Sequence, residues 1–336
     1  MIQLASTIKD VAQCAGVSVA TVSRVANRLG GVKPATERKI LQVMDELRYV
    51  PNILARSVAS QKTHLISMII PDIENPFFAA VYSGASQVAR NLSYTTLLGD
   101  SGNDADLEEK LLRVALEHRA SGIILTPVHE LPDWSTRVHL DLPVCLVDRN
   151  LEGLDCDKVL VDNQSGAYDA VRLLLENGHT RIGIISGPLD STPGKQRFEG
   201  YRKCLLDFGI PLDNRLVKIG DFREGSGYRL GMELLEMDNR PTAILSCNNL
   251  MTMGMLEAVN ATELQVGVDV AAVGFDDIPI ATLMSPKLTV VSRPMREMGE
   301  WAVKLLLQRI ENPDKPRQQI VMTPHLIVRG SETIRH

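Results

Sequence analysis

Residues 7–32, with the sequence TIKDVAQCAGVSVATVSRVANRLGGV, decide the fold of the N-terminal segment. Thr7 stands three residues ahead of Asp10, a spacing that is typical of a capping box at the start of a helix. Gly16 ends this first helix, and Ser18 immediately provides the N-cap of a second one. Two short helices joined by a glycine turn predict a helix-turn-helix.

A third helix is expected to complete this segment. Pro34 suits the first turn of a helix, because that turn does not need its missing amide hydrogen. Ile40, Val43 and Leu47 then follow at the i, i+3, i+7 spacing of one helical face. Three short amphipathic helices can bury these faces against one another, so residues 1–50 are predicted to form an all-α domain.

The outward face of the second helix has the chemistry of a DNA-reading surface. Its side chains are small apart from one guanidinium, and small side chains let a helix enter the major groove. The guanidinium can donate two hydrogen bonds to a guanine edge, and the aliphatic groups can contact thymine methyls. The residues of this face are Val19, Ala20, Thr21, Ser23 and Arg24.

Charge is distributed unevenly along the chain. The whole protein has a formal net charge of -5, yet residues 1–62 contain nine Lys and Arg residues against four acidic ones. A basic segment attached to an acidic body favours a polyanion as the partner of the first part alone. The first part is therefore expected to bind DNA, and the remainder is not.

From His64 onward, short apolar runs alternate with amphipathic stretches. We expect one lobe to contain the strands LISMII, YTTLLGD, GIILT, VCLVDR and VLVD. A second lobe is expected to contain RIGIISG, LVKIGDF, AILSC and VAAVGFDD. This βαβ alternation predicts an α/β fold with two Rossmann-like lobes of parallel sheet.

Polar side chains stand at the carboxyl ends of several of these predicted strands. Ligands of open parallel sheets bind at that edge. Amide, carboxylate and guanidinium groups can bond to the hydroxyls of a sugar, and aromatic rings can stack on its apolar face. The residues that lead us to expect a polyhydroxylated ligand are Asn75, Phe77, Phe78, Asp148, Arg149, Phe222, Asn248, Asn249, Phe275 and Asp276.

The N-terminal motifs resemble those of the lactose-repressor and purine-repressor family of transcription regulators. D-V-A, A-G-V-S, T-V-S-R-V and Y-x-P-N-x-x-A-R follow one another at the family spacing. The resemblance implies that Val19, Ala20 and Arg24 read base edges. It also implies that five other residues mostly touch phosphates, namely Thr7, Ser18, Thr21, Ser23 and Asn27.

The same resemblance implies a hinge over residues 51–63, which follows the headpiece and folds into a minor-groove helix only on the operator. Asn52, Ala55 and Val58 occupy the contact positions of this hinge. In the family, two hinges from a dimer insert a wedge residue, usually leucine, between base pairs. Val58 is a shorter, β-branched wedge.

Residues 64–336 resemble the effector domain that this family shares with periplasmic ribose-binding proteins, the periplasmic-binding-protein type I fold. The resemblance implies that the strand-end residues above bind a sugar, and it adds Arg197 from QRFEGYR. Arg293, in VSRPMREMG, stands where ribose binders tend to have glutamine. Its guanidinium can match a carboxylate or phosphate, so a sugar acid or sugar phosphate competes with a pentose such as ribose.

Other functions find little support in the sequence. An enzyme is disfavoured because the chain has no nucleotide-binding loop, no G-x-S-x-G or H-E-x-x-H motif, and its seven histidines are dispersed. The five cysteines form no C-x-x-C pair, so we expect reduced, mostly buried thiols, with neither a metal site nor a cofactor.

A transport binding protein is the other alternative, since it would share the two-lobed fold. It would need a signal peptide in place of a basic headpiece, and MIQLASTIKD has no basic region followed by an apolar one. We therefore expect a cytoplasmic repressor without a membrane segment. Tetramers of the family carry an extra leucine-heptad tail after the last strand, so a homodimer on a palindromic operator is expected here.

Overall fold

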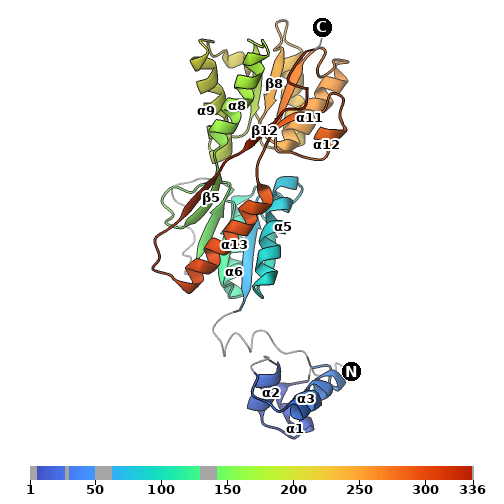
Figure 1. Cartoon of the computed structure of the whole chain (residues 1–336), viewed down its shortest axis with the longest axis vertical. Coiled ribbons are helices and arrows are strands. Elements are labelled where there is room, and N and C mark those ends of the chain that lie inside the picture. The colour runs from blue at the N-terminus through green and yellow to red at the C-terminus, as the bar shows by residue number, and fades with distance from the viewer. Residues whose placement is uncertain (1–5, 27–29, 50–62, 129–141, 335–336) are drawn as a thin grey trace. The chain divides into compact units, whose positions relative to one another are not determined.

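The computed structural model describes residues 6–26, 30–49, 63–128 and 142–334 of the chain (Figure 1). It divides into two compact units, Met1–Thr63 and His64–His336. Each unit buries its own set of apolar side chains.

The three predicted helices of the first unit are present. The capping box forms as the sequence indicates, because the Thr7 hydroxyl accepts from the Asp10 amide and the Asp10 carboxylate accepts from the Thr7 amide at 2.7 Å. The backbone hydrogen bond from Thr7 lowers the pKa of Asp10. The helices, which enclose a core that includes Val11, Val22 and Ile40, are α1 (Ile8–Ala15), α2 (Val19–Ala26) and α3 (Pro34–Glu46).

The first lobe of the second unit is a six-stranded parallel sheet in the order β11-β5-β4-β3-β1-β2. Its central strands β4, β3 and β1 are buried almost throughout, because helices cover both faces of the sheet. The strands are β1 (Leu65–Ile70), β2 (Thr95–Asp100), β3 (Gly122–Leu125), β4 (Val144–Val147), β5 (Asp157–Val161) and β11 (Gln319–Met322). The helices are α5 (Pro76–Asn91), α6 (Ala105–Glu117) and α13 (Met295–Glu311).

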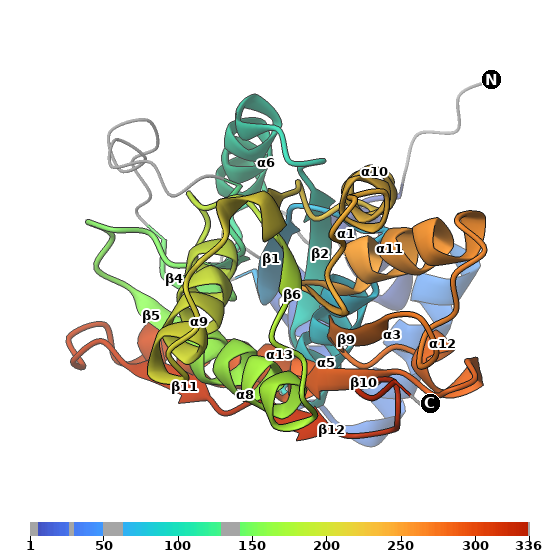
Figure 2. The same cartoon turned by 90° about the horizontal axis from the view of Figure 1, so that it is seen from above.

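The second lobe repeats this architecture in the order β12-β10-β9-β8-β6-β7, with β12 as an antiparallel edge strand. Figure 2 shows the pair α8 and α9 and the pair α10 and α11 on different sides of this sheet. The strands are β6 (Ile182–Ser186), β7 (Val217–Ile219), β8 (Ala243–Ser246), β9 (Ala271–Phe275), β10 (Thr289–Ser292) and β12 (His325–Ile327). The helices are α8 (Asn163–Glu176), α9 (Thr192–Asp207), α10 (Glu224–Leu235), α11 (Asn249–Ala261), the short α12 (Ile280–Leu283) and a 3-10 turn, Asn214–Leu216.

The chain passes between the lobes three times (Figure 1). It leaves the first lobe after β5, returns between β10 and α13 through Arg293 and Pro294, and leaves again between β11 and β12. The first lobe is therefore completed by α13 and β11, which come from near the C-terminus.

Close backbone contact fixes α13 against α5. A Cβ atom on Gly299 would lie 1.9 Å from the Val81 carbonyl oxygen, and one on Gly84 would lie 2.0 Å from the carbonyl oxygen of Arg296. Only glycine permits the two helices to approach this closely. The segment just before α13, which contains Arg293, is thereby held beside the N-terminus of α5.

The predicted fold class is confirmed, with a helical N-terminal region followed by two parallel-sheet lobes. Four of the five cysteines are buried and Cys14 is exposed. The strands β10 and β11 were not among those that the sequence predicts. The hinge proposed over residues 51–63 lies outside the described residues except for Thr63.

Candidate functional site

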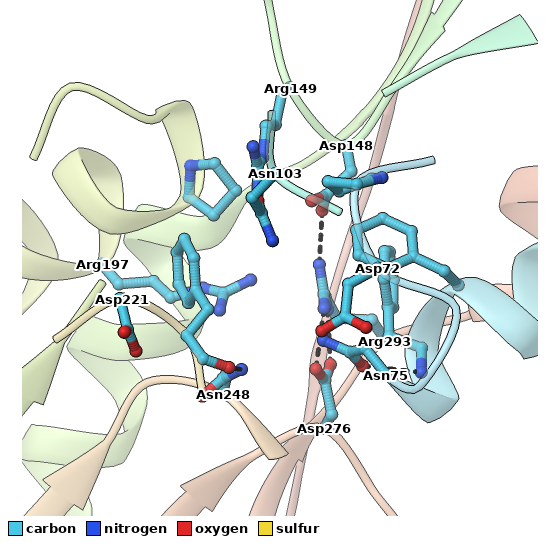
Figure 3. A pocket seen from close by; sticks show the side chains of 15 residues that line it. Asp72, Asn75, Asn103, Asp148, Arg149, Arg197, Asp221, Asn248, Asp276 and Arg293 are labelled. Atoms are coloured by element: carbon cyan, nitrogen blue, oxygen red, sulfur yellow. Dashed lines mark hydrogen bonds and ion pairs between the residues drawn. The ribbon is translucent and has the colours of Figure 1, made fainter. Parts of the chain in front are cut away.

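A cleft lies between the two lobes, at the carboxyl ends of strands from both sheets (Figure 3). Its mouth and interior together enclose about 420 Å3. The inner cavity measures only about 30 Å3, room for roughly two water molecules. The lining residues are Pro71, Asp72, Asn75, Phe77, Phe78, Asn103, Asp148, Arg149, Pro193, Arg197, Asp221, Phe222, Asn248, Asp276 and Arg293.

All of the residues expected at the effector site line this cleft, except Phe275 and Asn249. Phe275 is fully buried, and its ring centroid lies 3.8 Å from the guanidinium carbon of Arg197. It therefore supports a lining side chain from behind. Asn249, also singled out at a strand end, donates to the Asn75 side-chain oxygen at 2.9 Å and so joins the two lobes.

Two of the lining amides also cap helices. The Asn75 side chain accepts from the Phe77 amide at 3.0 Å at the start of α5, and the Asn248 side chain accepts from the Met251 amide at 2.9 Å at the start of α11. The Asn248 nitrogen donates to the Phe222 carbonyl at 2.8 Å. These bonds fix the amide orientations before any ligand contacts them.

Backbone strain is concentrated in the cleft. Asp148, Phe222 and Asp276 adopt φ angles of 68°, 68° and 75°. Non-glycine residues seldom adopt this left-handed conformation, and such strain is found preferentially where a side chain must point into a binding site. Each of the three follows a strand directly or closely and lines the cleft. Figure 3 shows the side chains of Asp148 and Asp276 pointing toward Arg293.

Arg293 lies inside the cleft and is paired with two carboxylates. Its Nε donates to Asp276 Oδ1 at 2.6 Å and its Nη2 to Asp276 Oδ2 at 2.8 Å, while Nη1 donates to Asp148 Oδ1 at 2.6 Å. The guanidinium also stacks on the ring of Phe77 at 3.8 Å. Burial alone would lower the pKa of Arg293, but Asp276 and Asp148 raise it above the ordinary value.

The other two arginines of the cleft donate to neutral groups. Arg197 donates to the Asn163 side-chain oxygen at 2.9 Å and to the Cys247 carbonyl. Arg149 donates to the carbonyls of Pro127 and Val128, both at 2.9 Å. Burial, followed by the nearby charge of Arg293, lowers the pKa of Arg197 to about 10, so this side chain stays charged at neutral pH.

Five lining residues were missed by the sequence analysis, namely Pro71, Asp72, Asn103, Pro193 and Asp221. Asn103 follows β2 and Asp221 follows β7, so the strand-end rule would have found both. Asp72 lies two residues beyond β1. Counting these residues, the lining contains four aspartates and three arginines, which gives the cleft a slight excess of negative charge.

The predicted DNA-reading face of α2 is exposed in the first unit. Val19, Ala20 and Arg24 are exposed, whereas Val22 and Val25 on the opposite face are buried. Arg24 Nε donates to the Gly30 carbonyl at 3.1 Å. The guanidinium of Arg24 is thus held at one end of the predicted DNA-reading face, beside Gly30.

The described residues predicted to contact phosphates lie at the start of α1 and along α2. Thr7 is exposed at the N-cap of α1, and Ser18 is exposed at the start of α2, where its hydroxyl accepts from the Thr21 amide at 3.2 Å. Thr21 and Ser23 are partly buried. Four further predicted contacts lie outside the described residues, namely Asn27, Asn52, Ala55 and Val58.

In the described part of the chain, no group of three or more His, Cys, Asp or Glu residues could hold a metal ion. None of the described helices is long and apolar enough to span a membrane.

Known families match both units. Residues 7–52 match the family described as bacterial regulatory proteins, lacI family, and residues 171–332 match the periplasmic binding protein-like domain.

Individual proteins match almost the whole chain. The ribose operon repressor of Escherichia coli (strain K12) is 34% identical over 328 residues, which cover 97% of this chain and 99% of that protein. The HTH-type transcriptional repressor PurR of Photobacterium profundum is 32% identical over 329 residues, covering 97% and 98%. The crystal structure of the lac repressor dimer bound to operator and the anti-inducer ONPF has a TM-score of 0.85 at 26% identity, covering 98% of this chain and 99% of that one.

Proposed function

Since this chain belongs to the lacI family of DNA-binding transcription repressors controlled by small molecules, we propose that its effector is a neutral sugar of the pentose type. The relatives are repressors, so the enzyme and transport alternatives are set aside. The finer proposal rests on one observation, the lining of the cleft. Amides, carboxylates and guanidiniums there meet aromatic rings, the combination that hydroxyls and an apolar ring face require.

Charge in the cleft favours a neutral ligand over an anionic one. The positive charge of Arg293 is already compensated by Asp148 and Asp276, so this arginine offers no unmatched charge to a carboxylate or phosphate. Asp72 and Asp221 add negative charge to the lining. Like charges would raise the cost of bringing an anion into this partly desolvated space.

A sugar acid is the second candidate, and Arg197 is the observation that favours it. Arg197 is 1% exposed, and both of its hydrogen-bond acceptors are neutral. A ligand carboxylate placed against it would form a charge-assisted pair. In that case the affinity should depend on Arg197 rather than on Arg293.

A thermal-shift screen of the full chain with pentoses, hexoses, sugar acids and sugar phosphates tests the proposal. A ligand at one hundred times its Kd stabilises the folded state by about 2.7 kcal/mol, so a neutral pentose should raise the Tm clearly. Asn248→Ala should abolish the shift, whereas Asp169→Ala on the exposed side of α8 should preserve it. Stabilisation by sugar acids alone would contradict a neutral effector.

We further propose that the first unit binds a near-palindromic operator as part of a homodimer in the cytoplasm. Val19, Ala20 and Arg24 would contact base edges, and the exposed Thr7 and Ser18 would contact phosphates. The structural relative is a dimer on its operator, which supports this arrangement. Selection of binding duplexes from a random pool should return two inverted half-sites about one helical turn apart, and a single unrepeated half-site would contradict it.

A further inference from the structure

Arg293 occupies an unusual position in the second unit. It lies in the segment between β10 and α13, where the chain returns from the second lobe to the first. Asp276 follows β9 in the second lobe, and Asp148 follows β4 in the first. The two ion pairs of Arg293 therefore form an Asp148–Arg293–Asp276 bridge between the lobes (Figure 3).

Other hydrogen bonds between the lobes involve no such pair of charges. The Asn249 side chain donates to the Asn75 side chain at 2.9 Å, and the Asn150 amide donates to the Thr192 hydroxyl at 2.9 Å. Arg223 reaches the Gly102 carbonyl at 3.3 Å, but in an exposed position. Among the described residues, the Asp148–Arg293 contact of this bridge is the buried ion pair that joins the lobes. The Arg293 side chain is 3% exposed.

The two halves of the bridge differ in strength. Asp276 receives two parallel hydrogen bonds from Arg293, and both residues flank adjacent strands of the same sheet. Asp148 receives one. A bidentate pair is the stronger one, so separation of the lobes would break the single bond to Asp148 and the stacking on Phe77, and would leave Arg293 with Asp276.

We propose that the Asp148–Arg293 pair holds the lobes together without help from a ligand, and that the effector must compete with Arg293 for Asp148. This inference rests on the proposed function in one respect only, the identity of the ligand that competes with Arg293 for Asp148. The inner cavity of about 30 Å3 supports it, because it is far smaller than the cavity of about 150 Å3 that is known to hold benzene. In the proposed mechanism, a sugar ring enters this inner space when the lobes part and the guanidinium gives up Asp148. Arg293 thus positions the two lobes relative to each other, and it limits the size of the ligand that fits between them.

The Asn150 amide provides a direct reporter of this contact, since it donates across the lobes to Thr192. Its hydrogen exchange should be measured in the full-length protein without added sugar. The Ile123 amide, which donates to the Pro143 carbonyl within the first lobe, is the internal control. Arg293→Gln should speed exchange at Asn150 by about tenfold or more beyond any change at Ile123, because opening of the lobes exposes Asn150 alone whereas global unfolding exposes both amides.

Two further variants make the test decisive. Asp148→Asn removes the pair but leaves Arg293 bonded to Asp276, so it should speed exchange at Asn150 even if Arg293→Gln fails to fold. Arg223→Gln removes the exposed inter-lobe contact and should leave Asn150 protected. Unchanged protection at Asn150 in both Arg293→Gln and Asp148→Asn would overturn the inference.

D-ribose serves as the probe for the second half of the proposal. Arg293→Gln should bind D-ribose at least about tenfold more tightly than the unaltered chain, since the competitor for Asp148 is gone. If no sugar binds either form while Asn150 exchange still responds, the proposed effector is wrong and the bridge stands. If D-ribose binds both forms equally, Arg293 does not compete for Asp148.

Discussion

The carboxylates that pair with Arg293 carry both backbone strain and buried charge. Asp276 combines a φ of 75° with two hydrogen bonds to Arg293, and both side chains are almost fully buried. Removing one member of a buried ion pair leaves the other charge uncompensated, which costs about 3–5 kcal/mol. The same argument does not apply when both charges are removed together.

Arg293→Gln is therefore expected to lower the free energy of unfolding by about 3–5 kcal/mol, because it leaves Asp148 and Asp276 buried without their cation. The triple variant Asp148→Asn, Arg293→Gln and Asp276→Asn should recover much of that loss, because none of the three charges remains. Urea denaturation of the single and triple variants measures the difference. Equal destabilisation by the single and triple changes would show that the buried charge is not the cause.

Arg24 is the residue on which base reading by α2 is expected to depend most. Arg24→Ala should weaken operator binding by about 1–3 kcal/mol and relax the preference at one base position, since a bidentate contact to guanine is lost. Fluorescence anisotropy with the operator and its single-base variants measures both effects. Arg38→Ala, an exposed arginine on α3 that donates to the Pro34 carbonyl, is the control and should leave base preference unaltered.

Single residues also show what the sequence can and cannot predict about the site. Asp148, Asn248 and Asp276 were predictable because each stands where an apolar strand ends. Arg197 lies within α9, so only the resemblance to a known family indicated it. The pairing of Arg293 was not predictable, because its partner Asp148 is 145 residues away and no local pattern encodes so distant a contact.

Among the elements, the contact between α5 and α13 depends most on residue size. Gly299→Ala should destabilise the second unit by about 1–3 kcal/mol or more, because the added methyl would overlap the Val81 carbonyl. Gly225→Ala on α10 is the matched control, since a Cβ there meets nothing within 4 Å. It should leave stability unchanged or raise it slightly. Thermal unfolding monitored by circular dichroism compares them, and equal Tm values would contradict the packing argument.

Strand prediction succeeded for apolar runs such as LISMII, which coincides with β1 and lies between His64 and Pro71. β10 was missed although it is buried. β11 alternates in burial at the edge of its sheet, so its sequence QIVM gives a weaker signal. Its pairing with β5 joins segments far apart in the chain, and the same is true of the contact between α13 and α5. Which lobe a segment joins is decided by such long-range packing and not by local periodicity.

At the scale of the whole molecule, a shortened chain tests whether the basic first unit alone binds DNA and the second unit alone binds the effector. A fragment of residues 64–336 should retain effector binding and lose operator binding, because it lacks the basic first unit. The affinity of the intact protein should fall steeply between 50 and 200 mM salt, on the order of a thousandfold for six or more phosphate contacts. Operator binding by the fragment at physiological salt would contradict this assignment.

The three passages of the chain between the lobes also govern the order in which the protein can fold as it leaves the ribosome. The first unit is contiguous and can fold as soon as it emerges. The sheet of the first lobe, by contrast, remains without β11 and the covering α13 until synthesis has passed residue 322. Its apolar strands stay incompletely covered while the whole second lobe is translated, so the nascent first lobe is the part most in need of chaperone protection.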